Sequence, residues 1–318
     1  MHGPFIQTVR LVSAALACVC VFALSPAART ATNIRVAVLD LGETQTGIRA
    51  AQAVRQSLSA DKLAVDNGVT IVDRNLAIAA ARGNGYQGSL NLTTQEARDL
   101  GAAIGCDFFI IGEAHTLKRS PSTGEDYFES YATIFIVSAR TGRLIAWQRP
   151  SERRETAEQA EQALLKNLTN ESSRYRVSIM RAADDEAAVR AAAVESPPAA
   201  LEVMSDDDES KTDTRAPRPY RRLKPPYPDA AAQAEVEAVV DVLVDIDARG
   251  EVGKIEIARW AGFGLDQSVI DTVRQLHFFP AMRDGVAIPM RVLLRYNFQR
   301  KVPDKAPAKT IIIPRPKP

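Results

Sequence analysis

Residues 238–257 read AVVDVLVDIDARGEVGKIEI, and this stretch decides the fold of the C-terminal part of the chain. The apolar run that ends at Ile246 predicts a strand. The polar residues 247–250 form a turn that ends in glycine, and residues 252–257 then continue as the paired strand. The stretch therefore predicts a β-hairpin.

The residues after the hairpin complete a small unit. Apolar side chains recur at helical spacing from Leu265 to Leu276, and we expect Phe278-Phe279-Pro280 to end this helix. From Met290 to Phe298 apolar and polar residues alternate strictly, which predicts a strand with one buried face. Residues 225–300 are thus expected to form a small α+β domain.

The segment contains four motifs in this order: Tyr227-Pro228, Val244-Asp245-Ile246 with Gly250, Leu265-Asp266, and Phe278 with Pro280. With these motifs it strongly resembles the TonB C-terminal domain, in which one helix packs against an antiparallel sheet. The chain departs from the family pattern at Glu237-Ala238, where the family has a glycine, and at Leu276, where it has an aromatic residue. The resemblance implies binding to an outer-membrane TonB-dependent receptor or another envelope protein.

Such a domain binds partners through an exposed sheet edge, whose free N–H and C=O groups accept an extended segment as an added strand. We expect the last strand, Arg291 to Asn297, to be this edge, with Tyr227 and Pro228 flanking the partner. For Tyr227 and Pro228, packing at the start of the domain is an equally good interpretation. The candidate partner-binding residues are Tyr227, Pro228, Arg291, Leu293, Arg295 and Asn297.

The N-terminal region has a different pattern. IRVAVLDL, residues 34–41, is a nearly continuous apolar run and predicts a strand buried on both faces. Strands and helices then alternate before a β-meander, which predicts an α/β domain with a mixed sheet over residues 33–180. The expected strands are 69–73, 108–112, 131–137 and 144–147, and the expected helices are 48–58, 76–81, 93–104 and 157–168.

This region contains a set of strand and turn features: Leu100-Gly101, Gly105-Cys106-Asp107, the strand that ends at Gly112, and Thr141-Gly142-Arg143. With these features it resembles the envelope domain shared by the TolB N-terminal region and CsgG-like proteins, over about residues 33–170. The resemblance implies a binding domain without known catalysis.

The segments outside the two expected domains are interpreted from their amino-acid composition. Residues 1–28 contain an apolar stretch from Leu11 to Leu24 before small residues, which predicts a cleaved export signal and a periplasmic protein. An uncleaved inner-membrane anchor is the alternative. Residues 181–224 lack apolar periodicity and include the acidic run 206–209, which predicts a flexible, disordered linker. We read residues 301–318 as a proline-rich tail.

Composition and motifs give little support for catalysis. A net charge of +1 makes nucleic acid an unexpected partner. The stretch 83–88 matches G-x-G-x-x-G, but it follows a helix instead of a strand, so it fails the context of a dinucleotide-binding site. His115 and His277 lack metal-ligand spacing, and Cys106 is expected to be a buried structural thiol. We expect no enzyme activity, no cofactor and no metal site.

The sequence therefore predicts a TonB-family envelope adaptor that binds a partner by β-strand addition. The alternative is an inner-membrane-anchored TonB energy transducer that serves transmembrane transport by outer-membrane receptors. Against the transducer, the segment from Leu11 to Leu24 has no His and no acidic residue. Assembly into a homo-oligomer stays open.

Overall fold

The computed structural model describes residues 33–60, 68–195 and 214–299. All of them belong to one unit of the chain, Asn33–Pro318. The expected export signal, the acidic run 206–209 and the proline-rich tail lie outside the described residues. No described helix is long and apolar enough to span a membrane.

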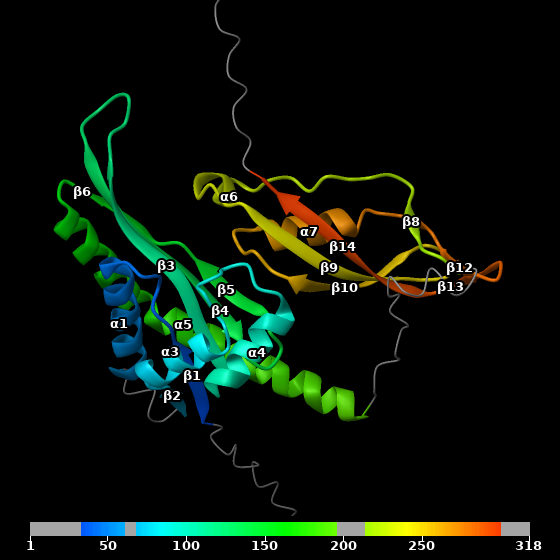
Figure 1. The fold of residues 1–318 in the computed structure, drawn as a ribbon, viewed down its shortest axis with the longest axis horizontal. Helices are drawn as coiled ribbons and strands as arrows, with labels where there is room; N and C mark the ends of the chain where they lie inside the picture. Colours follow the sequence, from blue (N-terminus) through cyan, green and yellow to red (C-terminus); the bar gives the residue numbers. More distant parts are fainter. Residues whose placement is uncertain (1–32, 61–67, 196–213, 300–318) are drawn as a thin grey trace, which may run out of the picture. The chain divides into compact units, whose positions relative to one another are not determined.

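The N-terminal region is built on a six-stranded mixed sheet (Figure 1). The order is β2-β1-β3-β4-β5, with β6 paired to β4. β1 is parallel to both β2 and β3, whereas β3, β4 and β5 form an antiparallel meander. The predicted α/β domain with a mixed sheet is confirmed. The strands are β1 Ile34–Val38, β2 Val69–Ile71, β3 Phe108–Arg119, β4 Tyr127–Ser138, β5 Leu144–Gln148 and β6 Ser151–Arg154.

Helices cover both faces of this sheet because the central strands are apolar on both sides. α1 (Gln45–Ala60) and α5 (Ala157–Glu195) share one hydrophobic cluster with the strand residues of one face. α3 (Arg74–Gly83) and α4 (Thr94–Ile104) pack on the other face. α4 begins with a capping box, in which Thr93 and Glu96 satisfy each other's backbone N–H groups.

The C-terminal region contains a three-stranded antiparallel sheet in the order β10-β9-β14. β9 is Ala238–Ile246, β10 is Val252–Arg259 and β14 is Met290–Phe298. α7 (Leu265–Val273) packs on one face of it, and α6 (Asp229–Gln233) precedes β9. Two small sheets pair β8 with β11 and join β7, β12 and β13. Their strands are β7 Thr214–Arg215, β8 Arg218–Pro219, β11 Phe278–Phe279, β12 Ala281–Arg283 and β13 Val286–Ile288.

Two boundaries differ from the sequence-based prediction. α5 continues to Glu195, past residue 180, and β7 and β8 lie within the expected linker. The helix persists because Ala, Glu and Arg favour helix even without an apolar stripe. In the C-terminal region α7 ends at Val273, before Phe278 and Phe279, which form strand β11.

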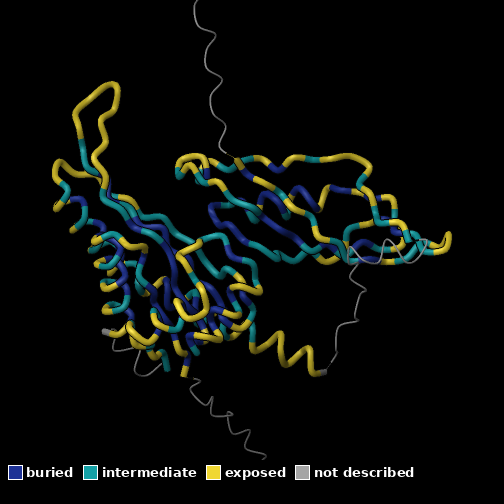
Figure 2. The backbone as a smooth tube through the Cα atoms, in the orientation of Figure 1, coloured by how far each residue is buried: buried dark blue, intermediate teal, exposed yellow. Residues whose placement is uncertain are grey.

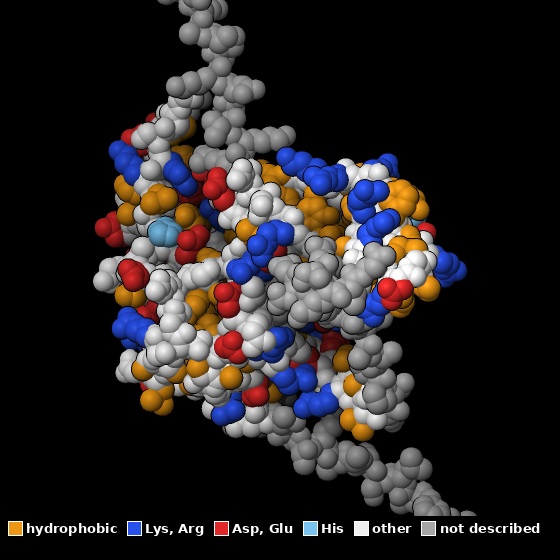
Figure 3. Space-filling view, turned by 45° about the vertical axis from the view of Figure 1, so that its right-hand side comes forward, with side chains coloured by type: hydrophobic (Ala, Val, Ile, Leu, Met, Phe, Trp, Pro, Cys, Tyr) orange, Lys and Arg blue, Asp and Glu red, His pale blue; other side chains and the backbone are white. Residues whose placement is uncertain are grey.

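Apolar side chains of both regions form one hydrophobic cluster, although the sequence predicts two domains joined by a linker. The cluster contains Leu100 and Phe135 of the N-terminal region together with Trp260, Phe263 and Val269 of the C-terminal region. Figure 2 shows the buried segments, which include the central strands of the N-terminal sheet and β9. On the face drawn in Figure 3, charged side chains of both signs are mixed, except for a group of Lys and Arg on the C-terminal region.

Candidate partner-binding site

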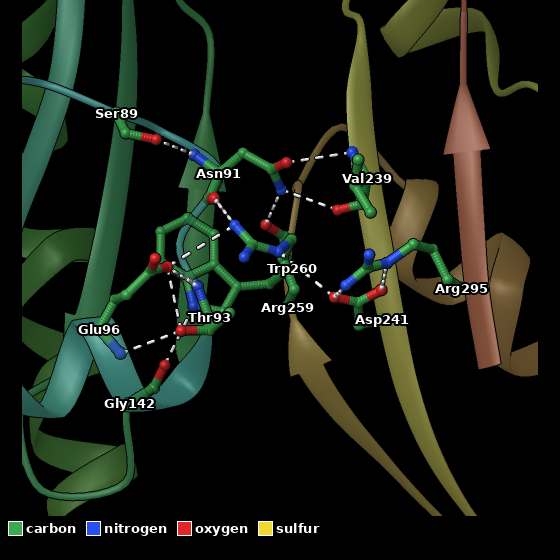
Figure 4. Close-up of polar contacts among 10 residues, drawn as sticks. All are labelled: Ser89, Asn91, Thr93, Glu96, Gly142, Val239, Asp241, Arg259, Trp260 and Arg295. Carbon is green, nitrogen blue, oxygen red and sulfur yellow. Dashed lines mark hydrogen bonds and ion pairs between the residues drawn. The ribbon is translucent and has the colours of Figure 1, made fainter. Parts of the chain in front are cut away.

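The C-terminal sheet has two edge strands, β10 and β14, and the chain itself covers part of one of them. Asn91 lies beside the start of β9, where its side-chain Nδ2 donates to the carbonyl oxygen of Val239 at 2.8 Å. Its Oδ1 accepts from the N–H of Val239 at 3.0 Å, and the same Nδ2 donates to the carbonyl of Trp260 at 2.6 Å. The side chain of Asn91 therefore continues the hydrogen bonding of β9 beyond the end of β10 (Figure 4).

Further contacts close the same end of β10. Thr93 forms an isolated antiparallel bridge with Arg259, and the N–H of Trp260 donates to the carbonyl of Leu92 at 3.2 Å. The Arg259 guanidinium donates to the carbonyl of Asn91 at 2.7 Å and lies 3.6 Å from the Glu96 carboxylate. The loop 91–93 thus occupies the β10 edge at its Arg259 end (Figure 4).

We call the contacts of residues 91–93 with β9, β10 and Trp260 the junction. Trp260 packs at the junction in the apolar cluster. Its side chain is 1% exposed, and its indole Nε1 donates to the carbonyl of Gly142 at 3.0 Å. The ring lies 5.6 Å from that of Phe135, and Phe263 lies 5.0 Å from Trp147. Gly142 has φ of +69°, and a Cβ there would collide with the Thr94 carbonyl. The turn at Thr141-Gly142 is therefore a point of contact between the regions.

The other edge, β14, is unpaired on its outer side among the strands of the described ranges. β14 pairs with β9 in unbroken register from Met290↔Ile246 to Phe298↔Ala238. Val239 directs its N–H and C=O to Asn91, on the β10 side, so Val239 and its partner Asn297 do not bond each other.

Because the register is unbroken, the pairing of Val239 with Asn297 shows which residues of β14 bond to β9 and which do not. Because successive residues of a regular strand direct their polar groups to opposite sides, the odd-numbered residues of β14 face away from β9. The N–H and C=O groups of Arg291, Leu293, Arg295 and Asn297 therefore lie on the open edge. These are the four β14 residues that the sequence analysis selected.

The side chains of these four residues lie on the outer face of the sheet, opposite α7. Arg291 makes a two-point ion pair with Asp245 at 2.5 and 2.9 Å, and Arg295 makes the same contact with Asp241 at 2.7 and 3.0 Å. Leu293 lies between the two pairs and is 52% exposed. The outer face therefore presents an apolar side chain between two fixed guanidinium groups.

Asp241 is the most enclosed member of this face, with 3% exposure. Burial tends to raise the pKa of its carboxyl, but hydrogen bonds and charges from Arg295 and Arg259 outweigh burial and lower the pKa. Asp241 is therefore ionised at neutral pH, and it joins the β14 side of the sheet to the junction at Arg259 (Figure 4).

Tyr227 and Pro228 lie at the start of the domain. The Tyr227 hydroxyl donates to the carbonyl of Val236, and its ring lies 6.1 Å from that of Phe298 at the end of β14. Pro228 is the N-cap residue of α6 and lies against Gly264. The structure thus brings Tyr227 to one end of β14, while both residues have internal packing contacts.

The features considered for chemistry have structural contacts. Gly83 is the last residue of α3, so the glycine-rich stretch does not join a strand to a helix. It lines part of a cavity of about 690 Å³ near the end of β1, where Arg74 already binds the Asp40 carboxylate. Cys106 is buried, and burial raises the pKa of its thiol to about 12.

The histidines also have neighbours in the fold. His277 Nδ1 lies 3.1 Å from Glu251, and the His115 ring lies 5.6 Å from that of Tyr131. Within residues 33–60, 68–195 and 214–299, no group of three potential metal ligands occurs.

Asn91, Trp260 and Phe263 were not predicted from the sequence as contact residues. The segment WAGFG, residues 260–264, carries two large apolar side chains between a strand and a helix, and this is the signal that could have revealed a contact. Asn91 offered no such signal, because its partners are 148 and 169 residues away.

Comparisons with known proteins identify a family at the C-terminus of the chain. No match was found among curated proteins. Similar solved structures include the hypothetical protein CT253 from Chlamydia trachomatis, with 9% identity, a TM-score of 0.31 and coverage of 46% of this chain and 96% of that chain. They also include the TonB CTD of Pseudomonas aeruginosa, with 20% identity, a TM-score of 0.25 and coverage of 32% and 97%. The family model of the Gram-negative bacterial TonB protein C-terminal matches residues 224–299, so the chain carries a TonB-type C-terminal domain there, as predicted.

Proposed function

We propose that this chain is an exported envelope protein that binds an extended segment of a partner as an added strand on β14. The observation that carries the proposal is the direction of the backbone. Arg291, Leu293, Arg295 and Asn297 present their N–H and C=O groups to the open edge, and an extended peptide can pair with such groups.

The junction favours β14 over β10 as the docking edge. Asn91 and Thr93 engage the end of β10 and the adjoining backbone of β9. A strand added to β10 would have to displace these contacts, whereas a strand added to β14 displaces no described strand. The described N-terminal region thus covers part of the β10 edge and contacts no strand pairing position of β14.

The side chains of the outer face suggest what the partner segment carries. Arg291 and Arg295 are held by aspartates, so their charges are largely neutralised in place. Leu293 offers an exposed apolar contact between them. The added strand is expected to place an apolar side chain beside Leu293 and polar side chains beside the arginines. Segments from the periplasmic ends of outer-membrane receptors are the first candidates.

We propose that the protein acts as an adaptor and not as an enzyme. In this proposal the N-terminal region docks to one envelope component while the TonB-type domain holds another. The mature N-terminus distinguishes the adaptor from an anchored energy transducer. Intact-mass analysis of the exported protein is expected to show removal of residues up to 27 or 28, and a mass that still includes Leu11 to Leu24 would favour the transducer.

The test of strand addition compares two substitutions at one position. Leu293→Pro removes an outward N–H and leaves the bonds between β14 and β9 in place, so we expect a folded protein that no longer binds receptor peptides. Leu293→Ala keeps the N–H and loses only the apolar side chain, so it should retain most of the affinity.

A further variant separates binding from folding. Val292→Ala lies on the core side of β14 and should lower the free energy of unfolding by roughly 1–3 kcal/mol while it still binds peptide. Each variant is titrated after circular dichroism has shown that it is folded. Normal peptide binding by folded Leu293→Pro would exclude β14 as the docking edge, and failure of every receptor peptide with the unmodified chain would remove the receptor as the partner.

A further inference from the structure

The basic segment at residues 214–224 is fixed on the surface of the C-terminal region. It reads TRAPRPYRRLK and contains five cationic residues and no acidic residue. Strand β7 pairs with β12 through Arg215↔Met282, and β8 pairs with β11 through Arg218↔Phe279. The N–H of Tyr220 then donates to the carbonyl of His277 at 2.9 Å. The segment therefore holds its charges at a defined place.

Exposed aromatic rings lie among these charges. Tyr220 is 60% exposed and Phe279 is 51% exposed, yet their ring centroids are 4.4 Å apart. The Arg218 guanidinium lies 5.3 Å from the centre of the Phe279 ring. We call the group formed by Arg215, Arg218, Arg221, Arg222, Tyr220 and Phe279 the basic–aromatic patch.

Within the described residues, the arginines of this patch have no acidic partner. All four arginines are exposed, and none of them forms an ion pair with another residue of the described ranges. Figure 3 shows Lys and Arg side chains gathered beside hydrophobic side chains on this region. Four like charges held close together repel one another, so an anionic partner would relieve this repulsion.

We propose that the basic–aromatic patch docks on an anionic membrane surface. Arginines bind lipid phosphates, and each cationic side chain near such a surface strengthens binding. Tyrosine and phenylalanine rings are suited to the interface, where an apolar body can sit at the level of the headgroups. Val286, in the neighbouring hairpin β12–β13, adds a third exposed apolar side chain at 65% exposure.

A membrane surface fits these features better than an acidic protein does. An acidic protein would need a recess that matches the projecting pair Tyr220 and Phe279, whereas the headgroup layer is soft and accepts side chains in any arrangement. The overall net charge of +1 also means that the attraction is local to the patch and is not a property of the whole chain.

The test is co-sedimentation of the full chain with two kinds of vesicle. One contains phosphatidylcholine alone, and the other contains equal parts of phosphatidylcholine and phosphatidylglycerol. We expect binding to the anionic vesicles that weakens as salt is added, because salt screens the charges. The N-terminal segment is identical in all variants, so differences among them report the substitutions.

Arg221→Gln with Arg222→Gln should weaken binding to the anionic vesicles about 25-fold, at about fivefold for each charge. Arg221→Lys with Arg222→Lys keeps the charges and should bind nearly as well as the unmodified chain. The matched control, Arg143→Gln with Lys166→Gln, removes two exposed charges from the N-terminal region and should leave binding unchanged.

Removal of the rings provides an independent measurement. Tyr220→Ser with Phe279→Ser should also weaken binding, since both side chains are exposed and the fold does not depend on their burial. Equal binding of the unmodified chain to both kinds of vesicle would overturn the proposal. Unchanged binding of the folded Gln pair or the folded Ser pair would overturn it as well. Retention of the chain by an acidic peptide but not by anionic vesicles would make the partner a protein.

Discussion

The contact of Asn91 with the C-terminal sheet yields the most informative stability prediction. Its side chain satisfies three backbone groups, which are the N–H and C=O of Val239 and the C=O of Trp260. Asn91→Ala removes all three hydrogen bonds at once. At about 1 kcal/mol for each bond, with part of the loss recovered by water, the free energy of unfolding should fall by roughly 2–3 kcal/mol.

The measurement combines urea unfolding with amide hydrogen exchange. In Asn91→Ala the amide of Val239 should lose protection, because Asn91 Oδ1 is its acceptor. Asn91→Asp keeps an acceptor for that amide but places a carboxylate against the carbonyls of Val239 and Trp260, so it should destabilise at least as much as alanine. Asn84→Ala, at an exposed position in the same loop, is the matched control and should change stability by less than about 0.5 kcal/mol.

Unfolding of Asn91→Ala at the same urea concentration as Asn84→Ala, with the amide of Val239 still protected from exchange, would contradict this prediction. The junction would then contribute nothing to stability, and the two regions would unfold independently of each other. If the junction is stable, the two regions should instead unfold together.

Three further predictions concern single positions. Asp266 is largely buried, and burial raises the pKa of its carboxyl to about 6. The folded-state pKa lies above the unfolded value, so the contribution of this carboxyl to stability is fully present below about pH 4 and is lost as pH rises through about 6. The loss is at most about 3 kcal/mol. Asp266→Asn should abolish this pH dependence, as measured by urea unfolding at several pH values. Gly142→Ala places a side chain at a φ of +69° and against the Thr94 carbonyl. It should lower the free energy of unfolding by roughly 1–3 kcal/mol and the melting temperature by several degrees. Gly83→Ala meets no neighbour and should have little effect. Cys106, buried and with its pKa raised to about 12, should react with iodoacetamide only after unfolding, and peptide mapping that found it alkylated in the folded protein would contradict its placement.

Much of the C-terminal domain could be predicted from sequence because local patterns specify it. Alternation from Met290 to Phe298 identified β14 and separated Val292 from Leu293 correctly. The hairpin of β9 and β10 followed from an apolar run, a turn ending in Gly250, and a second run. In the N-terminal region the expected helix at residues 93–104 agrees with α4, Thr94–Ile104. In each case neighbouring residues carry the signal.

The elements between the two regions, which are the end of α5 and the strands β7 and β8, were harder to predict for a physical reason. β7 and β8 contain two residues each and lie in a segment with proline, so they have no periodicity of their own. They are strands because β12 and β11 supply the pairing partners. The last turns of α5 carry exposed residues such as Val189 and Val194, and this lack of an apolar stripe resembled a linker.

By itself, the sequence determined the order of elements, the TonB-type domain at residues 224–299 and the strand with the candidate docking residues. Only the tertiary structure decided which sheet edge stays open, because Asn91 reaches Val239 across 148 residues of chain. Only the tertiary structure also placed Trp260 against Gly142 and set Arg218 over Phe279. Contacts of this kind join surfaces that are far apart in the sequence. A local pattern of residues predicts a helix or a strand, but it does not indicate which distant surface that element will contact.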